Sequence, residues 1–200
     1  MRIAVIGAGN IGGTLGKRWA QKGHDVRFGL REGSRRDDAA LRASGAGVAT
    51  IAEALADADV VLLALPGAAV PEFLASYGAA LNGKLVFDAT NQRGSAVMHQ
   101  VEQIRRAAPQ ARVYRAFNSL GWEVFENPQI DGQQADMFFC GAENGQDEAA
   151  RLIADIGVRP RYLGSDEQLP LLDALTQVWF ILAFQRGHGR HTALRVLSDS

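Results

Sequence analysis

Short apolar runs alternate with longer segments in which apolar residues recur every three or four positions, from residue 1 to about residue 184. The short runs are typical of strands and the longer periodic segments are typical of helices. This alternation predicts an α/β fold with a doubly wound, mostly parallel sheet of about eight strands. The runs expected to form strands are 1–6, 24–29, 47–50, 59–65, 84–88, 111–117, 136–140 and 158–163.

Polar residues ahead of three periodic segments mark expected helix starts. Thr50 and Glu53 have the spacing of a capping box, which predicts a helix from this point. Ser95 is expected to cap a helix whose inner face carries Val97, Val101 and Ile104. Asn144 is expected to cap a helix that buries Ala149, Leu152, Ile153 and Ile156.

The last periodic segment, 166–184, is apolar around most of its circumference, which predicts a long C-terminal helix buried on two sides. One face would cover the sheet, and the other would meet a second copy of the chain in an isologous homodimer. The alternative is a helix buried wholly within one subunit. We therefore expect one domain over 1–200, with 166–200 as a dimerising helix and tail.

The composition is that of a globular domain with no strong charge. Two hundred residues, 47% of them apolar, can bury the core of one domain. A formal net charge of −1 gives no electrostatic basis for binding nucleic acid or an anionic membrane. We expect the chain to open on a strand and not on a secretory leader, and no apolar run approaches the roughly 20 residues that span a bilayer. The single cysteine, Cys140, lies in an apolar strand, so we expect a buried core residue and a cytoplasmic location.

A glycine motif, Gly7-x-Gly9-x-x-Gly12, follows the first strand directly and opens the first helix. In this context the motif predicts a Rossmann dinucleotide site, in which the free N–H groups of the helix face a pyrophosphate. Gly7 permits the tight turn, Gly9 lets the backbone approach the pyrophosphate, and Gly12 lets helix and strand pack closely. The residues expected at the pyrophosphate are Gly7, Ala8, Gly9, Asn10, Ile11 and Gly12.

The end of the second strand indicates which dinucleotide binds. NAD-specific domains place an acid there for the ribose 2′-OH, whereas an arginine accommodates the 2′-phosphate of NADP. Arg31 stands at this point and favours NADP, while Glu32 directly after it would favour NAD if the register shifted by one residue. The residues expected at this end are Leu30, Arg31, Ser34 and Arg35.

Three further strand ends are expected to line the other half of the cofactor, because ligands of doubly wound sheets lie across the carboxyl ends of the strands. Asn91 and Asn118 offer donors and acceptors for a carboxamide or a ribose, although each could equally be a turn residue. The residues expected here are Ala64, Leu65, Pro66, Ala89, Thr90, Asn91 and Asn118.

Three blocks together resemble the NADPH-dependent reductases of the deazaflavin coenzyme F-420, and the reductase domain of the STEAP metalloreductases is similar. The blocks are Gly-Ala-Gly-Asn-Ile-Gly (7–12), Asp-Ala-Thr-Asn (88–91) and Ala-Phe-Asn-Ser-Leu-Gly (116–121). The resemblance implies that Gly7–Gly12 holds the pyrophosphate and Arg31 the 2′-phosphate. It also implies that Ala64–Pro66 and Asn91 border the ribose and nicotinamide, with Asn118 near the acceptor. The chain departs from the family at Leu30, where a serine is usual, and at Ala142, where an acid is usual.

No acid–base constellation suited to catalysis stands out, so we nominate no catalytic residue and no metal ligand. Hydride transfer between a nicotinamide and a flavin-like ring needs little side-chain chemistry, since the cofactors carry it. We expect an NADP(H)-dependent oxidoreductase whose partner is a small redox acceptor, such as a deazaflavin or flavin. Reduction of a small carbonyl or flavin-bound metal ion, and a non-catalytic NADP(H) sensor, are the alternatives. Arg186, His188 and Arg190 form an exposed basic tail or hold an anionic part of the acceptor.

Overall fold

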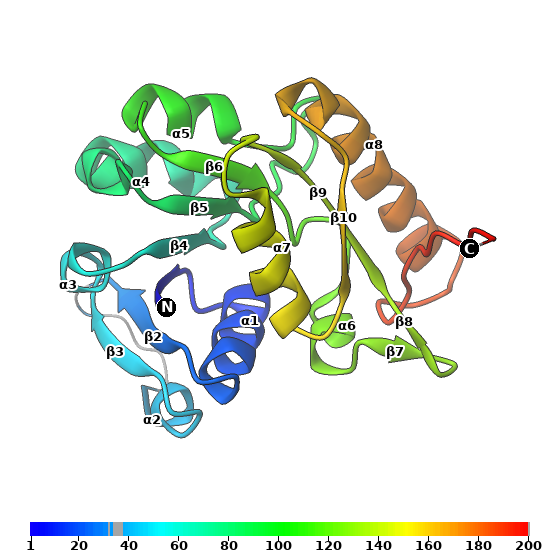
Figure 1. The fold of residues 1–200 in the computed structure, drawn as a ribbon, viewed down its shortest axis with the longest axis horizontal. Coiled ribbons are helices and arrows are strands. Elements are labelled where there is room, and N and C mark those ends of the chain that lie inside the picture. The colour runs from blue at the N-terminus through cyan, green and yellow to red at the C-terminus, as the bar shows by residue number, and fades with distance from the viewer. Residues whose placement is uncertain (32, 34–37, 200) are drawn as a thin grey trace.

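The computed structural model describes residues 1–31, 33 and 38–199, and its centre is one eight-stranded sheet (Figure 1). The order across the sheet is β10-β9-β6-β5-β4-β1-β2-β3. β1 to β6 are parallel in the order 3-2-1-4-5-6 that is typical of the Rossmann fold, while β9 runs antiparallel to β6. The predicted fold class is therefore confirmed. The strands are β1 (Arg2–Ile6), β2 (Asp25–Leu30), β3 (Gly47–Thr50), β4 (Val60–Leu63), β5 (Leu85–Asp88), β6 (Arg112–Arg115), β9 (Asp136–Gly141) and β10 (Arg159–Tyr162).

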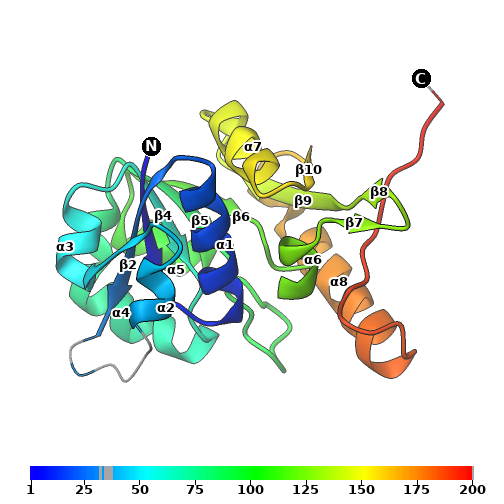
Figure 2. The same cartoon turned by 90° about the horizontal axis from the view of Figure 1, so that it is seen from below.

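Helices cover both faces of the sheet. One apolar core joins the sheet to α1 (Asn10–Gln21), α2 (Asp38–Arg42), α6 (Trp122–Glu126) and α7 (Gln146–Asp155). The other core joins it to α3 (Ile51–Ala56), α4 (Val70–Tyr77), α5 (Val101–Ala107) and α8 (Leu169–Phe180). Figure 2 shows β9 and β10 lying between α7 and α8. Single turns are η1 (Gly67–Ala69), η2 (Gly78–Leu81), η3 (Asp166–Gln168) and the π-helical η4 (Ile181–Gln185).

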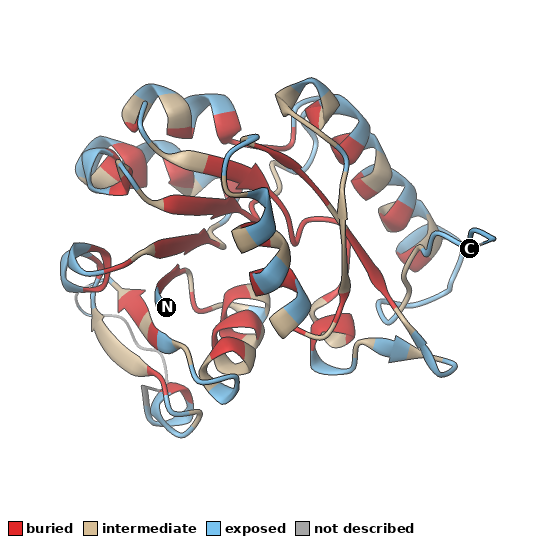
Figure 3. Cartoon of the chain, viewed as in Figure 1, coloured by how far each residue is buried: buried red, intermediate tan, exposed pale blue. Residues whose placement is uncertain are grey.

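Alternate side chains of the central strands enter different cores, because successive residues of a strand point to opposite faces. In β1, Ile3 and Val5 pack on the α1 side, whereas Ala4 and Ile6 pack on the α3 side. All four residues of β4 are buried, as its continuous apolar run predicts (Figure 3). Trp19 of α1 is fully buried, and its Nε1 donates to the carbonyl of Leu152 at 2.8 Å.

Several local predictions are confirmed. The Thr50–Glu53 capping box is present, with the Glu53 N–H on Thr50 Oγ1 and the Thr50 N–H on a Glu53 carboxylate oxygen. The C-terminal segment is helical throughout its predicted range, as η3, α8 and η4 in succession. Cys140 is buried in β9.

Two predicted helix starts are wrong. α5 begins at Val101 instead of near Ser95, and Val97 is exposed. The backbone N–H of Gln100 donates to Asp88 Oδ2 at 2.7 Å, so a distant carboxylate takes the capping role that we assigned to Ser95. α7 begins after Gly145, which adopts a left-handed φ of 87°, and not after a side-chain cap from Asn144.

Further elements were not predicted. The stretch expected to be irregular as far as residue 128 contains α6, and a hairpin of β7 (Gln129–Ile130) and β8 (Gln133–Gln134) follows it. These elements are too short to show a periodic pattern in sequence. Within the part of the chain that the structure describes, no helix is long and apolar enough to cross a membrane.

Candidate functional site at the carboxyl edge of the sheet

The glycine turn brings the end of β1 against the end of β4. Gly7 has a φ of +100°, and a Cβ there would lie 2.5 Å from the carbonyl oxygen of Ala64. A Cβ on Gly12 would overlap the carbonyl oxygen of Gly7. The predicted roles of Gly7 in the turn and of Gly12 in close packing therefore match the geometry. Gly9 precedes α1 with extended backbone, φ −70° and ψ −167°.

The first turn of α1 offers uncapped backbone donors at this edge. The N-cap residue, Gly9, has no side chain to cap the helix, and the first turn contains no acidic residue. The first intrahelical bond is the one from the Gly13 N–H to the carbonyl of Gly9, at 2.7 Å. The N–H groups of Asn10, Ile11 and Gly12 have no such partner, as in the first turn of any helix. Together with the helix dipole they form a site suited to a phosphate group.

Arg31 follows β2 on the same edge. Ile6 and Gly29 are paired in the sheet, so Arg31 lies two residues beyond the level at which β1 enters the glycine turn. Leu30 is half-buried and Arg31 is exposed. Ser34 and Arg35, which we predicted to act with Arg31, lie outside the described residues, as does Glu32.

The segment after β4 forms the wall opposite α1. The Ala64 N–H donates to the carbonyl of Ile6 at 2.9 Å, which holds the segment against the glycine turn. Ala64 and Leu65 are half-buried and Pro66 is exposed, and η1 begins at the next residue. The structure thus brings the residues predicted for the pyrophosphate and for the adjacent ribose to one place.

After β5, the predicted residues divide into interior and edge positions. Ala89 and Thr90 are buried, and both the N–H and the hydroxyl of Thr90 donate to Asp88 Oδ1, at 2.9 and 2.6 Å. Thr90 therefore closes a turn on a buried carboxylate. Asn91 is half-buried, and its Nδ2 donates to the carbonyl of Asn118 at 3.0 Å.

Asn118 lies deeper than we predicted for a residue near the acceptor. Its side chain is buried, and its Nδ2 donates to the Thr176 hydroxyl on α8 at 2.6 Å. Its Oδ1 has no hydrogen-bond partner among the described residues. Asn118 and Asn91 lie side by side, because the carbonyl of Asn118 accepts the Asn91 amide.

A buried ionic cluster beneath the two asparagines was missed by sequence reasoning. Arg115 at the end of β6 is fully buried and lies 3.6 Å from Asp88 and 3.1 Å from Asp173 of α8. It also donates to the carbonyl of Thr90 and, at 2.6 Å, to Asn91 Oδ1. The available signal was a charged residue directly beside apolar ones in sequence, at Arg115 and at Asp173, because buried charges are paired.

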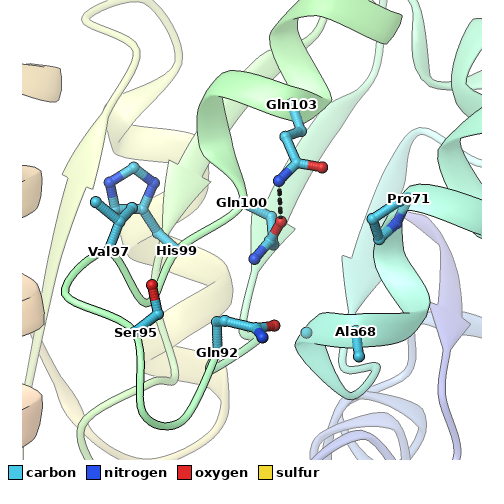
Figure 4. Close-up of a pocket in the computed structure, with 9 residues that line it drawn as sticks. Ala68, Pro71, Gln92, Ser95, Val97, His99, Gln100 and Gln103 are labelled. Atoms are coloured by element: carbon cyan, nitrogen blue, oxygen red, sulfur yellow. Dashed lines mark hydrogen bonds between the residues drawn. The ribbon is translucent and has the colours of Figure 1, made fainter.

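A second missed feature is a cavity of about 320 Å³ between η1, α4 and the segment that leads into α5 (Figure 4). It begins at Gly67 and Gln92, one residue beyond Pro66 and Asn91 respectively. Three glutamine amides contribute to its polar lining, and Nε2 of Gln103 donates to Oε1 of Gln100 at 2.7 Å. The lining residues are Gly67, Ala68, Pro71, Gln92, Ser95, Val97, His99, Gln100 and Gln103.

Three side chains of the sheet have a pKa that is raised by burial. Burial raises the pKa of Tyr114 to about 12, and its hydroxyl donates to the carbonyl of Asn144 at 2.7 Å. Burial also raises the pKa of Cys140 to about 12, which keeps its thiol protonated at neutral pH. Tyr162 has a raised pKa from burial, and its hydroxyl donates to the carbonyl of Gly141 at 3.1 Å.

The C-terminal tail packs back along α6. Arg190 pairs with Glu123 at 2.6 Å, and His191 Nε2 lies 2.8 Å from the carbonyl of Asn127. Arg186 and His188 are exposed. Among the residues described, no three His, Cys, Asp or Glu side chains are grouped as metal ligands.

Comparisons with known proteins agree with this architecture. Residues 2–92 match the family described as NADP oxidoreductase coenzyme F420-dependent. A candidate F420-dependent NADP reductase of Arthrobacter sp. FB24 has a TM-score of 0.87 and 24% identity, over 99% of this chain and 100% of that chain. A hypothetical protein of Sinorhizobium meliloti has a TM-score of 0.68 and 24% identity, over 100% of this chain and 96% of that one.

A reductive aminase of Aspergillus terreus, solved in complex with NADPH and ethyl-5-oxohexanoate, has a TM-score of 0.72 and 21% identity. The match covers 93% of this chain but only 62% of the aminase, so this chain spans less than two thirds of that protein. At these identities the solved structures show a shared fold. Residues 2–92, which include the glycine turn and the strand ends as far as Asn91, match the model of the coenzyme F420-dependent NADP oxidoreductases, in agreement with the resemblance of the sequence.

Proposed function

We propose that this protein is an NADPH-dependent oxidoreductase that transfers hydride between NADP(H) and a flavin-like or deazaflavin acceptor. The observation that carries the proposal is the N-terminus of α1 behind Gly7 and Gly12, where the N-cap residue Gly9 has no side chain to cap the helix and the turn leaves no room for a Cβ at Gly7 or Gly12. Such a cradle fits a pyrophosphate. The family match and the shared fold of an aminase solved with NADPH support the same cofactor.

In this proposal the cofactor lies across the carboxyl edge from β2 to β5. The first turn of α1 holds the pyrophosphate, and Arg31 pairs with the 2′-phosphate, for which a guanidinium provides a bidentate partner. Ala64 and Pro66 border the ribose. Asn91, whose side chain is half-buried at this edge, borders the nicotinamide.

The chain's own contribution is to bind and orient the two ring systems and to exclude water. The bound NADPH supplies the hydride, and a flavin-like ring accepts it without an acid from the protein. A carbonyl reductase would need a proton donor beside the substrate oxygen. The phenols of Tyr114 and Tyr162 are already bonded to backbone carbonyls, which favours the flavin-like acceptor.

The proposal is tested by mixing the protein with NADPH and following the loss of NADPH absorbance with a deazaflavin, FMN, a small ketone or a ferric chelate offered in turn. Turnover with the deazaflavin or FMN is the expected result. Turnover with the ketone or with the ferric chelate alone would favour the alternative reductase. Tight NADPH binding with no turnover in any mixture would favour an NADP(H)-sensing protein.

The 2′-phosphate assignment predicts a change of cofactor preference in Arg31→Asp. The variant should lose at least about tenfold of the preference for NADPH over NADH, since an attractive charge becomes repulsive. Arg151→Asp, the same change at an exposed position of α7, is the control and should keep the preference. An unaltered preference in Arg31→Asp would refute the assignment.

We also propose a homodimer formed by α8 and η4. Leu171, Val178, Ile181 and Phe184 are exposed, with 41 to 63% of each residue's surface accessible. An apolar surface of this kind on a short helix fits a self-complementary interface. A cytoplasmic location stays part of this proposal.

A further inference from the structure

The inner face of α8 carries two polar residues that point toward the candidate cofactor site. Asp173 and Thr176 are buried, with 3% and 0% of their surface accessible, in a helix whose other buried residues are apolar. Residues three apart lie on the same helical face. Each of these side chains begins a short series of hydrogen bonds that ends at Asn91.

The first series passes through Asn118. The Thr176 hydroxyl donates to the carbonyl of Leu172 at 2.9 Å and accepts the Asn118 amide at 2.6 Å. The backbone carbonyl of Asn118 in turn accepts Nδ2 of Asn91 at 3.0 Å. One side of the Asn91 amide is therefore held from α8 through Asn118.

The second series passes through Arg115. Asp173 Oδ1 accepts Arg115 Nη2 at 3.1 Å, and the same nitrogen donates to Asn91 Oδ1 at 2.6 Å. The other oxygen, Asp173 Oδ2, accepts the backbone N–H groups of Met98 and His99 at 2.8 and 3.3 Å. This carboxylate therefore fixes both the arginine and the segment that follows Asn91.

We propose that Asp173 and Thr176 are positioning residues, which fix the side chain of Asn91 from both sides and so orient the nicotinamide end of the cofactor. A primary amide has two N–H donors and two lone pairs on its oxygen, so Asn91 retains one N–H and one lone pair after these two bonds. That pair matches the carboxamide of a nicotinamide. The inference rests on the proposed function, in which Asn91 borders the nicotinamide.

The mildest test is Thr176→Val beside Thr176→Ser, because valine keeps the shape of threonine without its hydroxyl and serine keeps the hydroxyl. The dissociation constants of NADPH and of 2′-phospho-ADP-ribose, which lacks the nicotinamide, are measured for each protein. Thr176→Val should weaken NADPH binding by about fivefold or more and leave the fragment within about twofold, while Thr176→Ser keeps both affinities. The fluorescence of bound NADPH should change in the valine variant alone.

Asp173→Asn is the second variant, and Gln177→Ala, an exposed change on the same helix, is the control. A double-mutant cycle with Asn91→Ala separates positioning from loss of stability. If Thr176 and Asp173 act through Asn91, their substitution has no further effect on NADPH affinity once Asn91 is alanine.

The outcomes separate this inference from the proposed function. Failure of the wild-type protein to bind both NADPH and the fragment overturns the proposed function and, with it, the inference. If the wild-type protein binds NADPH and the fragment, the variants at Thr176 and Asp173 test the positioning role alone. That role is refuted if they change neither affinity, or if they change both affinities by the same factor. Additive effects with Asn91→Ala refute it equally.

Discussion

At the scale of single residues, two neighbouring glycines of α1 differ in what a side chain would meet. A Cβ on Gly12 would overlap the carbonyl oxygen of Gly7, whereas a Cβ on Gly13 would lie 3.6 Å from the carbonyl oxygen of Ala8, an ordinary contact. Of these two, Gly12 alone must therefore be glycine for the helix to approach the strand. This difference separates a glycine that the site needs from one that only lengthens the helix.

Gly12→Ala should move α1 away from the end of β1. We expect a loss of about 1–3 kcal/mol in the free energy of unfolding, as for overpacking in a core. NADPH affinity should fall at least about tenfold, because the first-turn donors are displaced. Urea unfolding and fluorescence titration with NADPH measure the two effects.

Gly13→Ala is the matched control. Alanine inside a helix is more favourable than glycine by about 0.5–1 kcal/mol, so this variant should be slightly more stable and should keep its NADPH affinity. Equal losses in the two variants would show that close packing at Gly12 does not maintain the cradle.

At the scale of elements, the hydrophobic pattern predicts strands better than helix starts. Every predicted strand of the main sheet is present within about two residues at each end, because most of them are short apolar runs with local boundaries. The start of α5 could not be predicted from the local sequence pattern. The N–H groups of Met98, His99 and Gln100, which lead into the helix, donate to Asp88 and Asp173, and the latter is more than 70 residues away in sequence. Local capping patterns do not contain such contacts.

The pair of Arg2 and Asp59 joins the beginnings of β1 and β4, and it predicts a pH dependence. Hydrogen bonds from the Arg2 side chain and backbone lower the pKa of Asp59 from 3.8 to about 2. A carboxyl whose pKa is lower in the folded state stabilises the fold above its unfolded pKa. This contribution is lost as the pH falls from about 4 to about 2.

Both partners are partly exposed, at 54% and 39%, so the contribution should be about 1 kcal/mol or less. Urea unfolding at several pH values should show a smaller loss of stability between pH 4 and 2 in Asp59→Asn than in the wild type. Glu72→Gln, the same loss of charge at an exposed position of α4, should keep the wild-type profile. An unchanged profile in Asp59→Asn would contradict the assigned pair.

At the scale of the whole molecule, α8 links parts that the sequence presents as separate. The glycine turn, Arg31 and the three strand ends could be placed on one edge from the parallel topology alone. The cluster of Arg115 and Asp173 could not, because the two residues are 58 positions apart and only the packed fold brings them together. The inner face of α8 thereby contacts the candidate site, while its outer face is exposed and apolar.

That outer face predicts a dimer in solution. Light scattering at micromolar concentration should give a mass near 43 kDa, twice the 21.5 kDa of one chain. The double variant Leu171→Asp, Val178→Asp places two like charges on the face and should give 21.5 kDa, without unfolding, since both positions are exposed. Leu197→Asp, at an exposed tail position, should keep the dimer. A wild-type mass near 21.5 kDa would refute the dimer. Like charges facing one another across a two-fold axis repel, so a dimer that survives the double variant would place the interface elsewhere.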